Sequence, residues 1–311
     1  MEFTVTITTV GVMLLYSAPG YLLVKAGKIK SESISAFAAL LMYVCQSCLV
    51  IYSFQKATYS PELFVKIAIF FTLAVVMQSV LLGTYYLLFR KRYKDVRMRI
   101  ATIASVLGNC AFMGVPLLEH LLPNYPDAVL FSAVYSISMN LLGWTIASAI
   151  IANDKKYVRV KNFLLNPSMI ALYIALPLFF THTSIGGNVF GEAVFLLARM
   201  TTPLCMLIMG MRLAQVPLKN VVTSKLNYFV LVMKQLIMPL IGLAIIMFLP
   251  IETNMKLTFY IICCCPIASV VLNYSELIGE GQSTAANLVL FGTFSSIITI
   301  PLMMTLAPFI Q

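Results

Sequence analysis

A group of residues that could bind a polar ligand lies around a proline inside an apolar stretch of this 311-residue sequence. Gly108, Asn109 and Gly114 come shortly before Pro116. Proline has no amide donor and its ring clashes with the preceding helical turn, so it frees backbone polar groups. An asparagine side chain adds donors and an acceptor without the desolvation cost of a charge. Together these groups could bind a carboxylate, although Asn109 could instead form a hydrogen bond between two helices.

The same pattern recurs in reverse order in the last third of the sequence. Ser269 and Asn273 follow Pro266, and Asn273 is as far from its proline as Asn109 is from its own. This interval corresponds to about two helical turns, or roughly 10.5 Å along a helix axis. An isolated proline often does no more than bend a membrane helix. A matched pair of prolines with polar neighbours, however, predicts a binding site.

Three charged residues lie within apolar stretches, where a charge usually has a partner or a function. Arg199 could offer its guanidinium to a substrate carboxylate, or extend to the membrane surface. We expect Lys234 to neutralise the C-terminal end of a helix or to pair with Glu276. Glu276 itself is expected to act as a gate or to lie at the surface. Paired aspartates, as in a dedicated sodium or proton antiport site, are absent from these stretches. This leaves the coupling open and favours proton-coupled or potential-driven transport over sodium coupling.

The composition excludes a soluble protein. Hydrophobic residues make up 60% of the chain and charged residues 10%, against about 25% charged residues in soluble domains. A transmembrane helix needs about 20 apolar residues, and stretches of that kind recur along the sequence. The alternating segments of about 10 residues that form a lipid-facing barrel are absent. The sequence therefore predicts an all-α integral membrane protein rather than a soluble enzyme or a nucleic-acid-binding protein.

Charged residues, Pro and Gly divide the chain into ten expected transmembrane helices. Their ranges are 4–24, 31–54, 62–89, 99–121, 126–152, 163–181, 188–211, 225–249, 255–278 and 283–309. Most of the 21 Lys and Arg residues fall in alternate loops, whereas Lys56, Lys66 and Lys256 lie in the opposite set. Because cytoplasmic loops carry the excess of basic residues, we expect a multi-pass protein of the cell membrane with both termini extracytoplasmic.

A basic segment near the middle of the chain divides these helices into two sets of five. We expect a first five-helix repeat at 1–152, a cytoplasmic linker at 153–162 and a second repeat at 163–311. Because five is odd, two tandem copies of one unit must have opposite orientations in the membrane. Pro116 and Pro266 then interrupt the fourth helix of each repeat. Such paired interruptions are typical of a substrate site at the bilayer midplane.

The run at 108–118, GNCAFMGVPLL, resembles the fourth-span motif of the auxin efflux carrier family, which includes plant auxin carriers and bacterial malate and malonate permeases. Further motifs agree with this family in their order along nearly the whole chain. They are Gly20-Tyr21-Leu22-Leu23, Asn166-Pro167, Thr202-Pro203, Gly210-Met211, Lys234 with Pro239, Pro266 with Glu276 and Gly279, and Ile300-Pro301-Leu302.

This resemblance implies ten helices in two inverted five-helix repeats, with broken helices four and nine crossing at the midplane. It also implies a homodimer and an elevator mechanism, in which a mobile domain carries the site at the crossing. The binding asparagine of the family corresponds to Asn109. The long cytoplasmic loop of many plant auxin carriers is absent here, which favours a compact carrier of the prokaryotic type.

These features predict a secondary active transporter of small organic anions, such as malate, malonate or auxin-like acids, with no cofactor and no metal. The expected substrate-binding residues are polar, flexible or helix-interrupting, with two supporting charges: Gly108, Asn109, Gly114, Pro116, Arg199, Pro266, Ser269 and Asn273, supported by Lys234 and Glu276. A channel or a receptor is the alternative, but a repeated filter element and a signalling domain are absent. A membrane-embedded enzyme is disfavoured, because His120 and His182 lie at the expected outer side without a catalytic partner.

Overall fold

The structure of the chain is a computed structural model that describes residues 3–154, 156 and 160–310. Within these residues the chain is all helical, as the composition predicts, and its β structure is limited to one isolated bridge. Four residues of the expected linker at 153–162, namely 155 and 157–159, lie outside the described residues.

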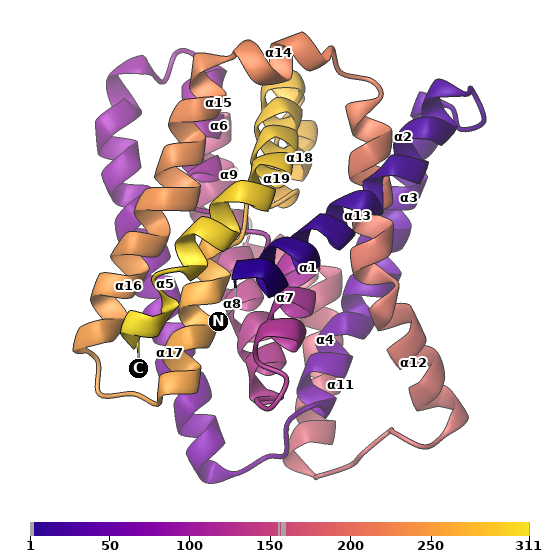
Figure 1. Cartoon of the computed structure of the whole chain (residues 1–311), viewed down its shortest axis with the longest axis vertical. Coiled ribbons are helices and arrows are strands. Elements are labelled where there is room, and N and C mark those ends of the chain that lie inside the picture. The colour runs from indigo at the N-terminus through magenta and orange to yellow at the C-terminus, as the bar shows by residue number, and fades with distance from the viewer. Residues whose placement is uncertain (1–2, 155, 157–159, 311) are drawn as a thin grey trace.

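The helices follow one another through short connections (Figure 1). In the first half they are α1 (Phe3–Leu15), α2 (Ser17–Lys25), α3 (Ile34–Leu40), α4 (Gln46–Gln55), α5 (Pro61–Phe89), α6 (Val96–Ala104), α7 (Val115–Leu121), α8 (Asp127–Leu142) and α9 (Ser148–Ala152). In the second half they are α10 (Val160–Leu164), α11 (Pro167–Phe180), α12 (Val189–Arg199), α13 (Thr201–Leu213), α14 (Leu218–Thr223), α15 (Lys225–Leu231), α16 (Met238–Phe248), α17 (Thr253–Cys264), α18 (Val270–Ile278) and α19 (Gln282–Met304). Wider π-helical turns join some of them, at Leu41–Cys45, Cys110–Gly114, Gly143–Ala147 and Val232–Ile237.

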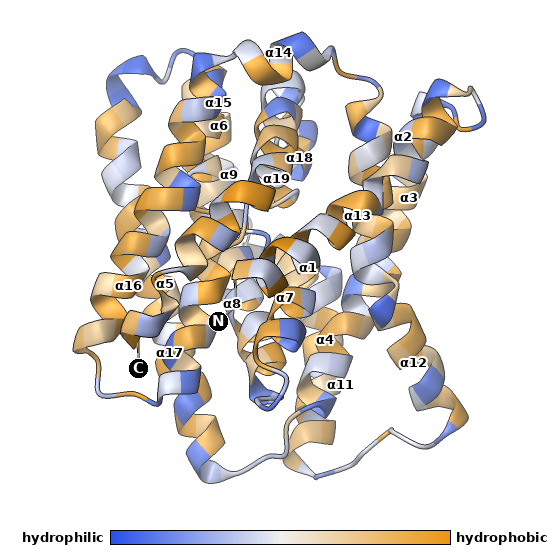
Figure 2. Cartoon of the chain, viewed as in Figure 1, coloured by the Kyte–Doolittle hydropathy of each residue, from blue (hydrophilic) through white to orange (hydrophobic). Residues whose placement is uncertain are grey.

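Seven helical stretches in the described chain are long and apolar enough to cross a membrane. They are Phe3–Lys25, Ser31–Gln55, Pro61–Arg92, Asp127–Ala152, Val189–Leu213, Lys225–Phe248 and Gln282–Met304. Figure 2 shows hydrophobic residues along these helices and hydrophilic residues gathered toward helix ends and loops. Large apolar side chains also face outward, such as Val80 and Leu87 of α5, each 61% exposed. These features describe a multi-pass membrane protein.

The other three expected spans have a different form. The span expected at 163–181 corresponds to α11, which has 14 residues. Those expected at 99–121 and 255–278 are each divided in two. In the first, α6 ends at Ala104 and helical structure resumes at Cys110; in the second, α17 ends at Cys264 and α18 begins at Val270.

The two irregular segments, 105–109 and 265–269, lie against each other, and we call this contact the crossing. Gly108 and Ile267 form an antiparallel bridge. The amide of Asn109 donates to the carbonyl of Pro266 at 2.7 Å, and the amide of Ala268 donates to the carbonyl of Leu107 at 2.9 Å. These bonds pair backbone groups that have no partner inside their own helices.

The first interruption lies at Gly108 and Asn109, and the prediction that it lies near Pro116 is wrong. Pro116 stands within a continuous helical stretch, Cys110–Leu121. A proline there leaves a carbonyl of the preceding turn without its amide partner. The hydroxyl of Thr202 on α13 donates to the carbonyl of Phe112 at 2.7 Å, so the freed acceptor is paired and the helix continues.

Side-chain caps fix where several helices begin. Ser60 accepts a hydrogen bond from the amide of Leu63 at the start of α5, and Asn188 accepts one from Gly191 at the start of α12. Each cap pairs an amide that has no acceptor within its helix. The connections from α2 to α3 and from α5 to α6 lie with α14 at one end of the molecule in Figure 1, and those from α4 to α5, α11 to α12 and α16 to α17 lie at the other.

Helices α2 and α13 pack backbone to backbone through two glycines. A Cβ atom added at Gly210 would overlap the main chain of Ser17, and one at Gly20 would overlap the main chain of Leu207. Because the obstructing atoms belong to the backbone, no change of rotamer can make room.

We predict that Gly210→Ala lowers the midpoint of thermal unfolding of the purified protein in detergent, because overpacking costs about 1–3 kcal/mol. Gly83→Ala is the matched control, since Gly83 also lies within a long helix but has open space around it. This control should unfold at the same temperature as the unaltered protein or higher. Equal midpoints for the two variants would contradict the close contact between α2 and α13.

Candidate functional site

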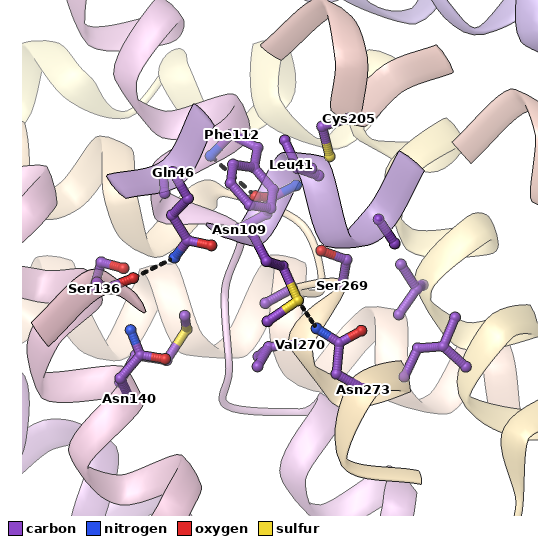
Figure 3. Close-up of a pocket in the computed structure, with 18 of the residues that line it drawn as sticks. Leu41, Gln46, Asn109, Phe112, Ser136, Asn140, Cys205, Ser269, Val270 and Asn273 are labelled. Carbon is purple, nitrogen blue, oxygen red and sulfur yellow. Dashed lines mark hydrogen bonds between the residues drawn. The ribbon is translucent and has the colours of Figure 1, made fainter. Parts of the chain in front are cut away.

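A cavity of about 300 Å³ lies at the crossing. Gly108 and Asn109 line it from the first irregular segment, and Ala268 and Ser269 line it from the second. The other walls come from α3 and the π-helical turn that follows it, from α8, α13, α18 and α19, and from the N-terminal end of α11. The crossing therefore places segments far apart in the sequence around one space (Figure 3).

Asn109 is buried, and both its backbone and its side chain are fixed in place. Its amide donates to Pro266, and its Oδ1 accepts a hydrogen bond from the amide of Phe112 at 3.2 Å. Within the described residues, the Nδ2 group of Asn109 has no protein acceptor. The side chain thus caps the helical stretch that follows and keeps its donor group for whatever occupies the cavity.

Two helical stretches begin at the cavity, Cys110–Leu121 and α18. The first amides of a helix have no acceptor within it and carry a partial positive charge. Ala111, Ser269 and Val270 line the cavity, and no backbone acceptor is found for their amides in the described part of the chain. Helix starts of this kind favour an anion.

Two further carboxamide side chains, which are not part of the motifs at the two prolines, also line the cavity. Gln46 donates through Nε2 to the hydroxyl of Ser168 at 2.9 Å. Asn140 on α8 is only 7% exposed, and its side chain has no hydrogen bond to the described protein. The sequence feature that could have identified Gln46 and Asn140 is a carboxamide in the middle of an expected span, where an uncharged polar group needs a partner.

Asn273, on α18, faces the opposite wall of the cavity. Its Nδ2 donates to the thioether sulfur of Met42 at 3.0 Å, as Figure 3 shows. A thioether is a weak acceptor, so an oxygen of a bound ligand would be the stronger partner for this donor.

Arg212 is the one cation among the described residues that line the cavity. It lies near the C-terminal end of α13, and its Nη1 donates to Oε1 of Glu276 on α18 at 3.0 Å. The side chains of Arg212 and Glu276 are 16% and 49% exposed. From the sequence alone Arg212 was assigned to a basic cytoplasmic loop. The local sequence at the end of a span does not indicate whether a charged side chain faces water or a cavity.

Lys234 is fully buried behind the crossing. Its Nζ donates to the carbonyl of Cys263 at 3.0 Å, at the C-terminal end of α17. Two partners were expected for Lys234, a helix C-terminal end and Glu276. Lys234 contacts the helix end, and Glu276 pairs with Arg212 instead. A Cβ atom at Gly108 would lie 3.0 Å from both Cε and Nζ of Lys234, so the lysine packs directly against the first irregular segment.

Not all the residues singled out in the sequence lie at the cavity. Gly114 and Pro116 lie in the helical stretch after the interruption, and Pro266 supplies its carbonyl to Asn109 rather than a cavity wall. Arg199 is exposed at the C-terminal end of α12 and does not line the cavity. Gly108, Asn109, Ser269 and Asn273 are the members of the expected set that the fold brings together around it.

Comparison with known families agrees with the motifs at the crossing. The family described as membrane transport protein matches residues 4–164 and 158–304, nearly the whole chain. A comparison with curated proteins gave no match. The resemblance indicated by the run at 108–118 is confirmed. The chain belongs to the membrane transport protein family, the family of the auxin efflux carriers, and is a membrane transporter.

Proposed function

We propose that this transporter is a secondary active carrier of small organic anions, such as malate, malonate or an auxin-like acid, and that it binds their carboxylates in the cavity at the crossing. One observation carries the proposal. The amides of Ala111, Ser269 and Val270, which have no backbone acceptor in the described chain, and the Nδ2 group of Asn109 belong to residues that line it, and Arg212 lines the same cavity. No acidic residue is among the described residues that line the cavity.

This arrangement favours a carboxylate for an electrostatic reason. A small anion entering a largely apolar space loses its water and needs several hydrogen bonds in return. Donors already fixed by the backbone provide them without further ordering, and bonds to a charged acceptor are about twice as strong as neutral ones. Phe112, Met139 and Trp144 also line the cavity and offer apolar contact for the carbon skeleton.

The proposal includes ten transmembrane helices in two inverted repeats, at 1–152 and 163–311. Each half contains an interrupted helix in fourth place, and the two interruptions bond to each other. The basic connections after α2 and α5 lie at one end of the molecule. We propose that this end is cytoplasmic and that both termini are extracytoplasmic.

The transport step that we propose is an elevator movement within a homodimer, coupled to a proton. The lining of the cavity comes from α3, α11 and α13 and from α8, α18, α19 and the crossing. We propose that these two groups of helices move against each other. A site between two groups of helices can pass from one side of the membrane to the other when one group moves against the other.

Ligand binding tests the substrate class directly. We expect malate, malonate or indole-3-acetate to raise the unfolding temperature of the purified protein, whereas malonamide, which has no carboxylate, leaves it unchanged. A ligand at 100 times its Kd stabilises the folded state by about 2.7 kcal/mol. A shift by the amide as large as that by the acids would contradict an anion site.

Side-specific labelling tests the orientation. We expect Arg97→Cys to react with a membrane-impermeant maleimide only from the cytoplasmic side and His182→Cys only from outside, in a background without the native cysteines. Both positions are exposed; Arg97 lies in the first turn of α6 and His182 in the connection from α11 to α12. Labelling of the two positions from one side would refute the inverted repeat.

Substitution of Asn109 tests the site itself. We expect Asn109→Ala to weaken carboxylate binding by about 10- to 100-fold, since a hydrogen bond to a charged group contributes roughly 1.5–3 kcal/mol. Asn109→Asp should weaken it further, because it places a negative charge beside the anion. Isothermal titration calorimetry with the same acid measures the affinity of the unaltered protein and of each variant.

The aspartate variant is also the folding control for this series. Its carboxylate can still accept the hydrogen bond from the amide of Phe112, whereas alanine removes this cap. An Asn109→Asp protein that binds the acid as tightly as the unaltered one would show that Asn109 only joins helices.

A further inference from the structure

Helix α18 is tied to the opposite wall of the cavity by two polar contacts. Asn273 donates to the sulfur of Met42, in the π-helical turn after α3, and Glu276 accepts from Arg212 on α13. Asn273 and Glu276 are three residues apart on one helix and therefore lie on the same face. The first contact lies inside the cavity, and the second involves the cation of its wall.

The contact between Arg212 and Glu276 uses only part of the guanidinium. One nitrogen, Nη1, meets one carboxylate oxygen. A guanidinium has five N–H donors in a planar fork that fits a carboxylate with two parallel bonds. Arg212 also lines the cavity, whereas Glu276 does not. A small carboxylate in the cavity can therefore approach the same arginine.

We propose that Glu276 is a built-in competitor for the anionic substrate: the substrate carboxylate takes its place on Arg212 and thereby releases α18 from α13. This inference rests on the proposed function and names the residue that recognises the charge. In the empty carrier the pair of Arg212 and Glu276 holds the two walls together.

The difference in exposure explains why the exchange can occur. Glu276 is 49% exposed, so water solvates its carboxylate once the pair opens. Ion pairs as exposed as this one are weak, because solvent screens them. A carboxylate inside the cavity would meet Arg212 together with the unpaired amides at the starts of two helices. The bound anion therefore replaces Glu276 on the guanidinium of Arg212, and the ion pair between α18 and α13 is broken.

Two neutral variants, with malonate, malate and indole-3-acetate as probes and malonamide as the uncharged comparison, test this idea. Arg212→Gln should weaken binding of the acids by about 10- to 100-fold, since it removes a charged donor. Glu276→Gln should strengthen binding by about 1.4- to 5-fold, because the competitor for Arg212 is gone. Opposite directions are the decisive result, since a pair that merely holds the fold would shift both affinities the same way.

Two further proteins keep the test interpretable. Arg212→Lys retains the charge but not the fork, and should bind the acids with an affinity between those of Arg212→Gln and the unaltered protein. Arg97→Gln removes a guanidinium from another ion pair, with Asp95 at 2.7 Å, that does not line the cavity. It should leave binding unchanged.

The possible failures are distinguishable. Weaker binding of the acids by Glu276→Gln, or unchanged binding by Arg212→Gln, would overturn the proposal that Glu276 competes with the substrate. If Asn109→Asp still weakens binding of the same acid, the proposed function stands. If none of the acids stabilises the unaltered protein, the proposed function and this inference are both wrong.

Discussion

Backbone polar groups inside an apolar molecule must find partners, and the whole site depends on how two interrupted helices meet this requirement. In a membrane, water cannot hydrogen-bond to an amide or carbonyl that a broken helix leaves free. The two irregular segments pair with each other through two of these groups' bonds, from Asn109 to Pro266 and from Ala268 to Leu107. Among the described residues of the crossing, the amides of Ser269 and Val270 have no backbone acceptor, and both residues line the cavity. The constraint that makes an interruption costly thus also leaves a set of fixed donors where a ligand can reach them.

The charges around the crossing follow from the directions of its helices. Helical stretches begin on the cavity side, and α17 ends at the crossing with carbonyls that its own helix cannot pair. Lys234 is buried against this end and donates to Cys263, which places a cation where the helix carries partial negative charge. The described residues that line the cavity include hydrogen-bond donors and one guanidinium, and no acidic residue is among them. Lys234 therefore matches the helix end that it faces, and the donors at the cavity favour anions.

Movement of the site would need some walls of the cavity to be rigidly packed and others only lightly joined. Helices α2 and α13 meet through Gly20 and Gly210 with almost no side chain between them, so this wall tolerates little change. The contacts between α18 and the opposite wall include a thioether acceptor and a partly exposed ion pair. Both are weak and can be replaced by a ligand. An elevator movement in response to binding would use this difference.

The sequence alone determined the all-helical membrane architecture and the family, because hydropathy and local motifs depend on residues close together in the chain. It also pointed to Gly108, Asn109, Ser269 and Asn273, whose polar or flexible character is unusual within apolar stretches. The position of the first interruption was decided by the tertiary structure, since Thr202, far along the chain, pairs the carbonyl of Phe112 that Pro116 would leave free. The partner of Glu276 and the place of Arg212 in the cavity wall were likewise decided there. The sequence around a charge at the end of a span is the same whether the charge faces water or a ligand. The cavity lining and the ion pair between α13 and α18 distinguish the two.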